Sequence, residues 1–168
     1  MVFARSKLLI EDDLLRPKPV IKLHYSGPRP TRFYKEIPAL IHAIFKTHTG
    51  QLQEKKLIWT RGDPEKFSVE WTLEKDMDKY TYYDVDVRMD GSESKGVGTV
   101  SIAFEGLLRT EYPQDTVWER SLFYEILRMI WHNTFYDVKR DSMIRDGRRL
   151  MAQLQEEMKT LMGEMKGD

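Results

Sequence analysis

Two aspartates and an arginine alternate within KYTYYDVDVRMDG, residues 79–91. In an extended strand Asp84 and Asp86 would lie on one face, about 7 Å apart. Such a carboxylate pair suits acid/base hydrolysis of a glycosidic bond. It would also supply part of a metal site, which needs further oxygen ligands. The flanking sequence offers neither those ligands nor a sugar-binding context.

The apolar residues between the charged ones favour a structural interpretation. Asp84, Asp86 and Arg88 share one face with Tyr82, whereas the opposite face carries Tyr83, Val85, Val87 and Met89. The apolar face is expected to join the core, so the acids are expected in solvent or paired with Lys and Arg of neighbouring strands. We therefore predict no catalytic residue and no metal ligand, and we expect no cofactor.

The remaining reactive side chains also lack a recognisable pattern. His24, His42, His48 and His132 form neither HxxxH nor HExxH, and by environment His132, beside Trp131, is the best general-base candidate. The chain has no cysteine. That composition excludes disulfides, thiolate metal sites and a cysteine nucleophile, and it fits a reducing cytoplasm.

A basic cluster, KRDSMIRDGRRL, spans residues 139–150 and raises the question of phosphate binding. Asp141 and Asp146 interleave with its cations, which favours a solvated helix face. Lys+Arg and Asp+Glu both number 27, so the net charge is zero. This balance argues against a broad nucleic-acid footprint and makes self-association easier.

Length and composition indicate one globular domain. The chain has 168 residues, of which 40% are hydrophobic and 32% charged, enough to bury a core. No apolar run reaches about 18 residues, so we expect no membrane span. The opening residues MVFARSKLLIEDDLLRP do not resemble a signal peptide, because their apolar stretch is short and acids follow it at once.

Alternation of apolar and polar residues predicts an antiparallel meander with one buried face. A helix with an apolar stripe is predicted over 31–50, with Pro38 kinking or splitting it and Gly50 ending it. The predicted strands are residues 20–27, 53–60, 66–74, 79–89 and 97–108.

Two further helical segments follow the strands. Residues 117–135 begin after a capping-box pattern at Thr116 and Glu119 and are apolar over most of the circumference. We expect this helix to pack against the sheet. The tail 137–166 instead carries a narrow 3-4 seam, formed by Ile144, Gly147, Met151, Leu154, Met158, Leu161 and Met165. The seam fits self-packing, a coiled coil or partner contact, or an interfacial membrane helix.

The order of elements over residues 20–136 resembles the helix-grip fold of the START and pollen-allergen-like superfamily. This resemblance implies a curved sheet wrapped around a long C-terminal helix, often with a hydrophobic cavity between them. A cystatin-like sheet gripping one helix is a competing arrangement. The chain departs from the helix-grip pattern, because five strands are predicted where six or seven are usual and the heptad tail has no counterpart. The resemblance carries over no functional residue.

These observations predict an α+β fold in which an antiparallel meander packs on a long C-terminal helix, followed by an extended heptad-patterned helix. We expect a flexible arm over 1–19, an α+β domain over 20–136 and a helical extension over 137–168. The leading functional hypothesis is a non-enzymatic domain that binds a hydrophobic ligand or a protein partner. The tail serves as an association element through Ile144, Met151, Leu154, Met158, Leu161 and Met165.

The hypothetical ligand pocket lies between the sheet and the helix 117–135. Its predicted lining is Phe67, Val69, Trp71, Tyr83, Val85, Val100, Ile102 and Phe104 from the sheet, with Trp118, Leu122, Ile126 and Ile130 from the helix. Other hypotheses are an assembly or adaptor protein and a cyclase- or hydrolase-like enzyme that uses Asp84, Asp86 or His132. Nucleic-acid binding through 139–149 is a weaker one.

Overall fold

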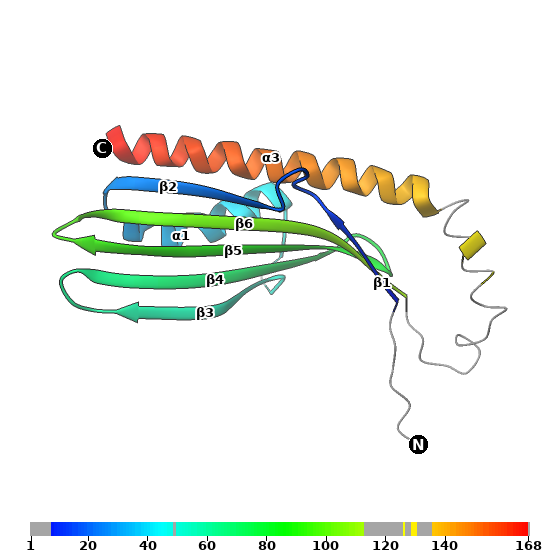
Figure 1. The fold of residues 1–168 in the computed structure, drawn as a ribbon, viewed down its shortest axis with the longest axis horizontal. Coiled ribbons are helices and arrows are strands. Elements are labelled where there is room, and N and C mark those ends of the chain that lie inside the picture. The colour runs from blue at the N-terminus through cyan, green and yellow to red at the C-terminus, as the bar shows by residue number, and fades with distance from the viewer. Residues whose placement is uncertain (1–7, 49, 113–125, 127–128, 131–135, 168) are drawn as a thin grey trace, which may run out of the picture.

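A computed structural model describes residues 8–48, 50–112, 126, 129–130 and 136–167 of the chain (Figure 1). The fold is α+β, as predicted, with an antiparallel sheet and a long C-terminal helix packed against it. In chain order the elements are β1 (Leu8–Asp13), β2 (Val20–Pro28), the 3-10 helix η1 (Pro30–Arg32), α1 (Phe33–Phe45), β3 (Leu52–Thr60), β4 (Glu65–Asp76), β5 (Thr81–Ser94), β6 (Val97–Tyr112) and α3 (Asp137–Gly167).

The sheet is a meander of β3, β4, β5 and β6, completed by the two N-terminal strands. All pairs are antiparallel, and the order is β1-β6-β5-β4-β3. β2 also pairs with β6, along Val97–Glu105, beside the part that pairs with β1. β6 can hold both strands because it is 16 residues long.

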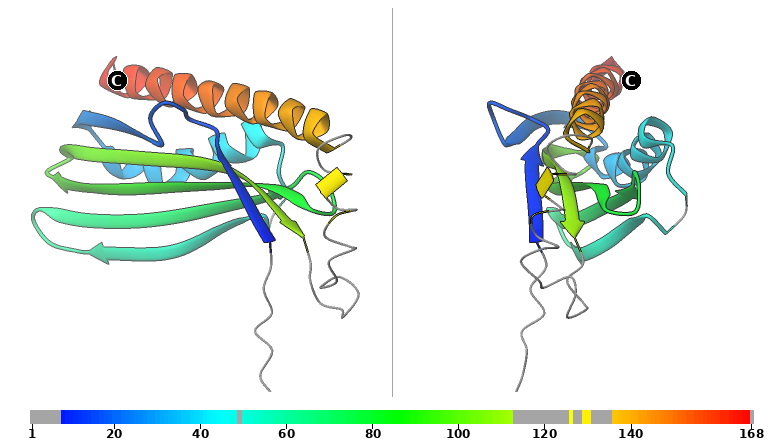
Figure 2. Two further views of the ribbon diagram at one scale, coloured as in Figure 1. Left: turned by 45° about the vertical axis from the view of Figure 1, so that its right-hand side comes forward. Right: turned by 90° about the vertical axis from the view of Figure 1, so that its right-hand side faces the viewer.

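One face of this sheet is buried and the other is polar. The inner face lies beneath α1 and α3, which contact each other above it (Figure 2). Tyr83, Val85, Val87 and Met89 point inward from β5 and are all fully buried, as the alternation predicts. Burying such side chains contributes roughly 2–3 kcal/mol each, which accounts for the strict alternation in the central strands.

The N-terminal region differs from the prediction. Residues 1–19 are predicted as a flexible arm, whereas Leu8–Asp13 form β1 and pair with Leu107–Tyr112 of β6. The sequence LLIEDD does not alternate, so its pattern carries no strand signal. The part of β6 that β2 leaves unpaired provides the hydrogen-bonding partner.

Helix α1 matches the predicted apolar stripe but is shorter than 31–50. It runs without a break through Pro38 and ends where Lys46 adopts a left-handed conformation, φ 50°. Phe33, Ile37 and Ile41 lie fully buried on its inner side. The loss of one backbone donor at Pro38 therefore does not split the helix, because the buried stripe continues on both sides of it.

The long helix that packs on the sheet is α3, and most of the segment 117–135 lies outside the described residues. A single core cluster joins α3 to the inner face and to α1. The tail is thus part of the α+β unit, and of the three possibilities for its seam the structure adopts self-packing. No described helix combines the length and apolar character needed to cross a membrane.

Close approach of α3 to the sheet depends on a glycine and two tyrosines. A Cβ atom on Gly147 would lie 2.8 Å from Tyr83 Cε1 and 2.9 Å from Leu14 Cδ2, so only glycine fits without a shift. The Tyr83 hydroxyl donates to the Met143 carbonyl at 2.6 Å, and the Tyr25 hydroxyl donates to that of Met165 at 3.1 Å. The sheet thereby holds α3 near both ends.

Replacing Met158 with alanine tests this packing. Met158 is fully buried, so M158A should lower the free energy of unfolding by about 2–5 kcal/mol through lost contacts and a residual cavity. Urea denaturation measures the change. The exposed neighbour Glu157 provides the control, since E157A should stay within about 0.5 kcal/mol of the parent. Equal effects of the two substitutions would mean that α3 does not bury Met158.

Candidate functional site

The structure brings together the sheet residues of the predicted ligand pocket but packs them as a core. Their exposed fractions lie between 0% and 3%, and they belong to the cluster that α1 and α3 complete. These residues are Phe67, Val69, Trp71, Tyr83, Val85, Val100, Ile102 and Phe104. Packing alone accounts for their burial.

The helical half of the predicted pocket falls mostly outside the described residues. Trp118 and Leu122 lie outside the described residues. Ile126 and Ile130 are 48% and 56% exposed, so they do not line a cavity against the sheet. Helices α1 and α3 complete the core over the inner face, and the packing of 117–135, most of which lies outside the described residues, stays a prediction.

The predicted interaction seam is directed inward. Met151, Leu154, Met158 and Met165 are buried, and Ile144 and Leu161 are partly buried against the same core. In this conformation the seam binds the chain's own sheet and is not presented to a partner. Apolar area that is already removed from water cannot also drive association.

The acidic pair lies on the outer face, as its alternation predicts. Asp84 is only 9% exposed, because Arg109 covers it, with Nη1 2.5 Å from Asp84 Oδ2. Burial raises the pKa of Asp84, the Arg109 guanidinium opposes this, and Asp86, Glu74 and Glu11 raise it further. Asp86 accepts a hydrogen bond from Thr72. Among the described residues no group of His, Asp and Glu has the arrangement of a metal site.

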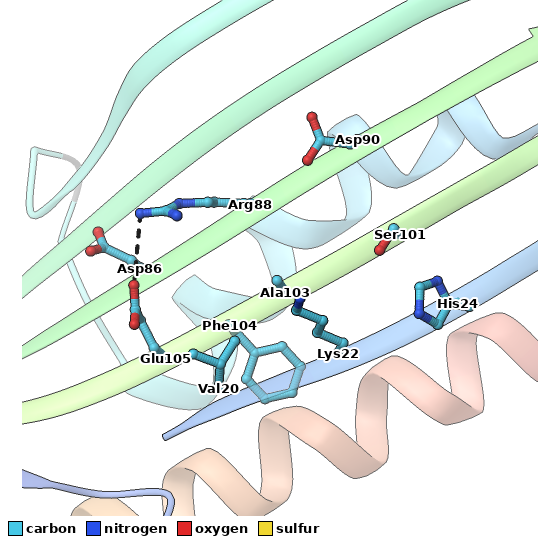
Figure 3. A pocket seen from close by; sticks show the side chains of 10 residues that line it. All are labelled: Val20, Lys22, His24, Asp86, Arg88, Asp90, Ser101, Ala103, Phe104 and Glu105. Atoms are coloured by element: carbon cyan, nitrogen blue, oxygen red, sulfur yellow. Dashed lines mark ion pairs between the residues drawn. The ribbon is translucent and has the colours of Figure 1, made fainter. Parts of the chain in front are cut away.

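A hollow of about 510 Å³ on the outer face contains the three side chains most reminiscent of a hydrolase (Figure 3). Asp90, Ser101 and His24 lie opposite one another on β5, β6 and β2. Ser101 occupies the middle strand, and no hydrogen bond joins these three side chains. Nucleophile activation requires the histidine between serine and carboxylate. This row therefore lacks the order of a catalytic triad.

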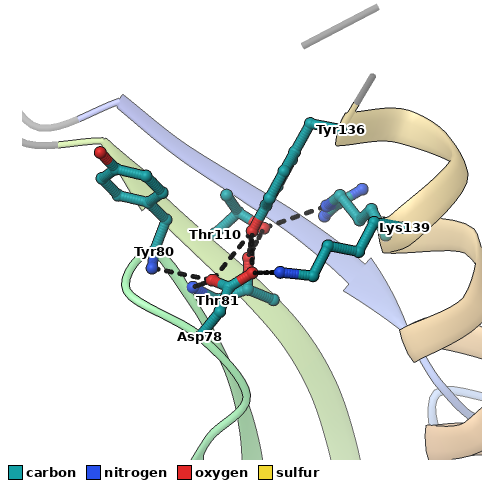
Figure 4. Close-up of polar contacts among 7 residues, drawn as sticks. Asp78, Tyr80, Thr81, Thr110, Tyr136 and Lys139 are labelled. Carbon is teal, nitrogen blue, oxygen red and sulfur yellow. Dashed lines mark hydrogen bonds and ion pairs between the residues drawn. The ribbon is translucent and has the colours of Figure 1, made fainter. Parts of the chain in front are cut away.

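A buried polar cluster joins the start of α3 to the sheet (Figure 4). Asp78 accepts hydrogen bonds at 2.9 Å from the backbone N–H groups of Tyr80 and Thr81 and at 2.7 Å from Lys139 Nζ. The Tyr136 hydroxyl donates to both carboxylate oxygens at 3.0 Å. Every acceptor position of Asp78 is thus directed at structural partners.

The same cluster explains the first two cations of the sequence 139–150. Lys139 binds Asp78, and Arg140 is 6% exposed. Arg140 donates to Thr110 at 3.0 Å and to Asp12 of β1. Burial raises the pKa of Tyr136 to about 12, so its hydroxyl remains a donor at neutral pH. Lys139 and Arg140 therefore stabilise the fold, and fewer cations of the sequence 139–150 remain available to bind a phosphate.

A largely apolar hollow lies at the edge of the sheet, between β2, α3 and the β1–β2 connection. Its volume is about 580 Å³, within the range of ligand sites. Ile21 and Leu23 of β2 and Leu15 of the connection are partly buried and touch the core. The rest of the lining is Pro17, Lys18, Val20, Lys22 and Gln155. We call this hollow the edge groove.

The sequence pattern does not reveal the edge groove. Residues 20–27 alternate like any half-buried strand. The only local signal is Pro17 and Pro19, which precede β2 and cannot donate backbone hydrogen bonds. Gln155 joins the groove through the packing of α3, about 130 residues further along the chain.

Sequence comparisons do not assign the chain to a family. No protein-family model matches it, and no curated protein matches it significantly.

The polar cluster at Asp78 predicts a pH dependence of stability. Burial would raise the pKa of Asp78, but hydrogen bonds from Lys139, Tyr80, Tyr136 and Thr81 outweigh burial and hold it below 3.8. Because the folded pKa is depressed, the ionised group stabilises the fold above the unfolded pKa and loses this effect as the pH falls through the folded pKa.

D78N should therefore lower the free energy of unfolding by about 1–3 kcal/mol at pH 7. The difference in the free energy of unfolding between D78N and the parent should become smaller as the pH falls from about 5 to 2. Chemical denaturation at each pH measures both effects. Asp76 is exposed nearby and provides the control. D76N should neither lower the free energy of unfolding at pH 7 nor change its dependence on pH. A pH-independent gap for D78N would contradict the assigned role.

Proposed function

We propose that this chain is a non-enzymatic binding domain that docks a protein partner at the edge groove. The observation that carries the proposal is the groove itself: an open apolar hollow, continuous with the core, where no strand of the described residues borders β2 on one side. Apolar surface left open beside a tightly packed core is a common feature of interaction sites.

The chemistry of the described residues supports binding over catalysis. Asp84 is paired with Arg109, and Asp78 is saturated by structural hydrogen bonds. His24 lies beside Ser101, but the strand order denies it a carboxylate partner. His132 lies outside the described residues. Among the described side chains named here, no nucleophile is paired with an oriented base.

A protein partner also fits better than an apolar ligand held in the interior. The sheet residues predicted to line an internal pocket are almost completely buried by the chain itself. The helix-grip assignment remains part of our proposal. The order of elements along the chain supports it: α1 follows β2 and precedes the strands β3–β6, and a long helix follows β6.

A substitution on α3 tests the proposal. Gln155 lines the edge groove and is partly exposed, whereas Gln153 is exposed on the same helix and does not line it. Peptides selected from a random display library against the parent chain provide ligands. We expect Q155W, which fills the groove, to weaken their binding at least about tenfold, and Q153W to leave it unchanged, as measured by fluorescence anisotropy.

Two results would contradict the proposed function. One is the absence of any selected peptide that distinguishes Q155W from the parent. The other is equal loss of binding in both variants, which would place the interaction elsewhere on α3. Thermal unfolding of each variant verifies that the fold is retained.

A further inference from the structure

We propose that the partner docks as an extended strand that pairs with the free edge of β2 and alternates apolar with acidic side chains. This inference rests on the proposed function and specifies its partner. It follows from the direction of the edge groove, the unpaired backbone of β2 and the charges of the lining.

The edge groove follows the backbone of β2 and not one face of the sheet. Val20, Ile21, Lys22 and Leu23 all line it. Successive residues of a strand point to opposite faces, so a hollow on one face would contact only every second one. Four consecutive lining residues place the groove along the strand edge itself.

That edge has hydrogen-bonding groups to offer. Within the described part of the chain, β2 pairs with β6 alone, from Val20↔Glu105 to Pro28↔Val97. The backbone groups directed away from β6 have no partner strand. An apolar small molecule would leave them unsatisfied, whereas an added strand would bind them in the usual ladder.

The two faces of β2 determine the side chains that such a strand would carry. Ile21 and Leu23 lie on the inner face and touch the core, so apolar side chains of the added strand would contact them. Lys22 points to the outer face, Lys18 lines the same groove, and no carboxylate lines it. Neither lysine takes part in an ion pair with the described residues. Acidic side chains facing outward would complement both.

The opposite edge of the sheet is less suited to this role. β3 carries a register shift between Glu54 and Lys56, and such an irregularity interrupts the hydrogen-bonding ladder at an edge. Leu57 and Ile58 are 47% and 51% exposed there. The β3 edge therefore serves as an internal control for peptide binding at the β2 edge, because both edges are present in one molecule.

The probe is acetyl-Glu-Val-Glu-Val-Glu-Val-Glu-amide carrying a fluorescent label, titrated by anisotropy against the full chain. We expect it to bind about tenfold more tightly than the counterpart with lysine in place of glutamate, an advantage that falls with added salt. A double variant with Lys18→Glu and Lys22→Glu should reverse this order. Both lysines are exposed, so the variant should fold.

Two further measurements test strand pairing itself. N-methylation of the peptide, either at every valine or at every glutamate, blocks one edge of its backbone without changing its side chains. At least one of these two forms should lose binding. Amide hydrogen exchange at saturating peptide should show new protection in residues 20–23 and none in residues 52–60.

The inference is overturned if both methylated peptides bind like the parent peptide, or if protection appears at β3. Displacement of the peptide from the edge groove by decanoate, with no amide protection at β2, would also overturn it in favour of an amphiphile site. These results leave the proposed function standing as long as display-selected peptides still distinguish Q155W from Q153W. Failure of that distinction overturns the proposed function itself.

Discussion

The packing of α3 against the inner face of the sheet is the contact on which the rest of this structure depends. A single antiparallel sheet needs one face removed from water, and α1 covers only part of it. Met151, Leu154 and Met158 are fully buried on α3, and without them the central strands would face solvent. Hydrogen bonds fix the orientation of α3 on this apolar surface. They come from the polar cluster at Asp78 and from the hydroxyls of Tyr83 and Tyr25, and they hold the helix near both ends.

This arrangement divides the surface into regions of different character. The outer face is covered by charged side chains that largely neutralise one another, such as Arg88 with Glu70 and Arg109 with Asp84. Such pairs keep a sheet face soluble but contribute little binding energy. Near the start of β2, by contrast, Ile21 and Leu23 are only partly covered. The same helix that completes the core thus forms one wall of the proposed docking site.

Much of the fold was predictable because alternation is a local property. The meander was expected from residues such as Phe67, Val69 and Trp71, and each is buried as the pattern requires. The packing of α3 on the sheet was only one of three possibilities that the sequence of the tail left open. A narrow apolar stripe is typical of a helix that packs one side on a sheet and exposes the other to water, as α3 does. β1 and the contact of Asp78 with Tyr136, 58 residues apart, depend on long-range pairing that a local pattern does not encode.

The abundance of methionine beneath α3 has a chemical consequence. Met89, Met143, Met151, Met158, Met162 and Met165 are all buried between helix and sheet. Burial leaves these thioethers little contact with solvent, so separation of the helix from the sheet would greatly increase their exposure to oxidants. Conversion to the polar sulfoxide would then disfavour repacking. Oxidative damage would therefore accumulate in molecules that have opened, and a sulfoxide reductase would be needed to return them to the native state.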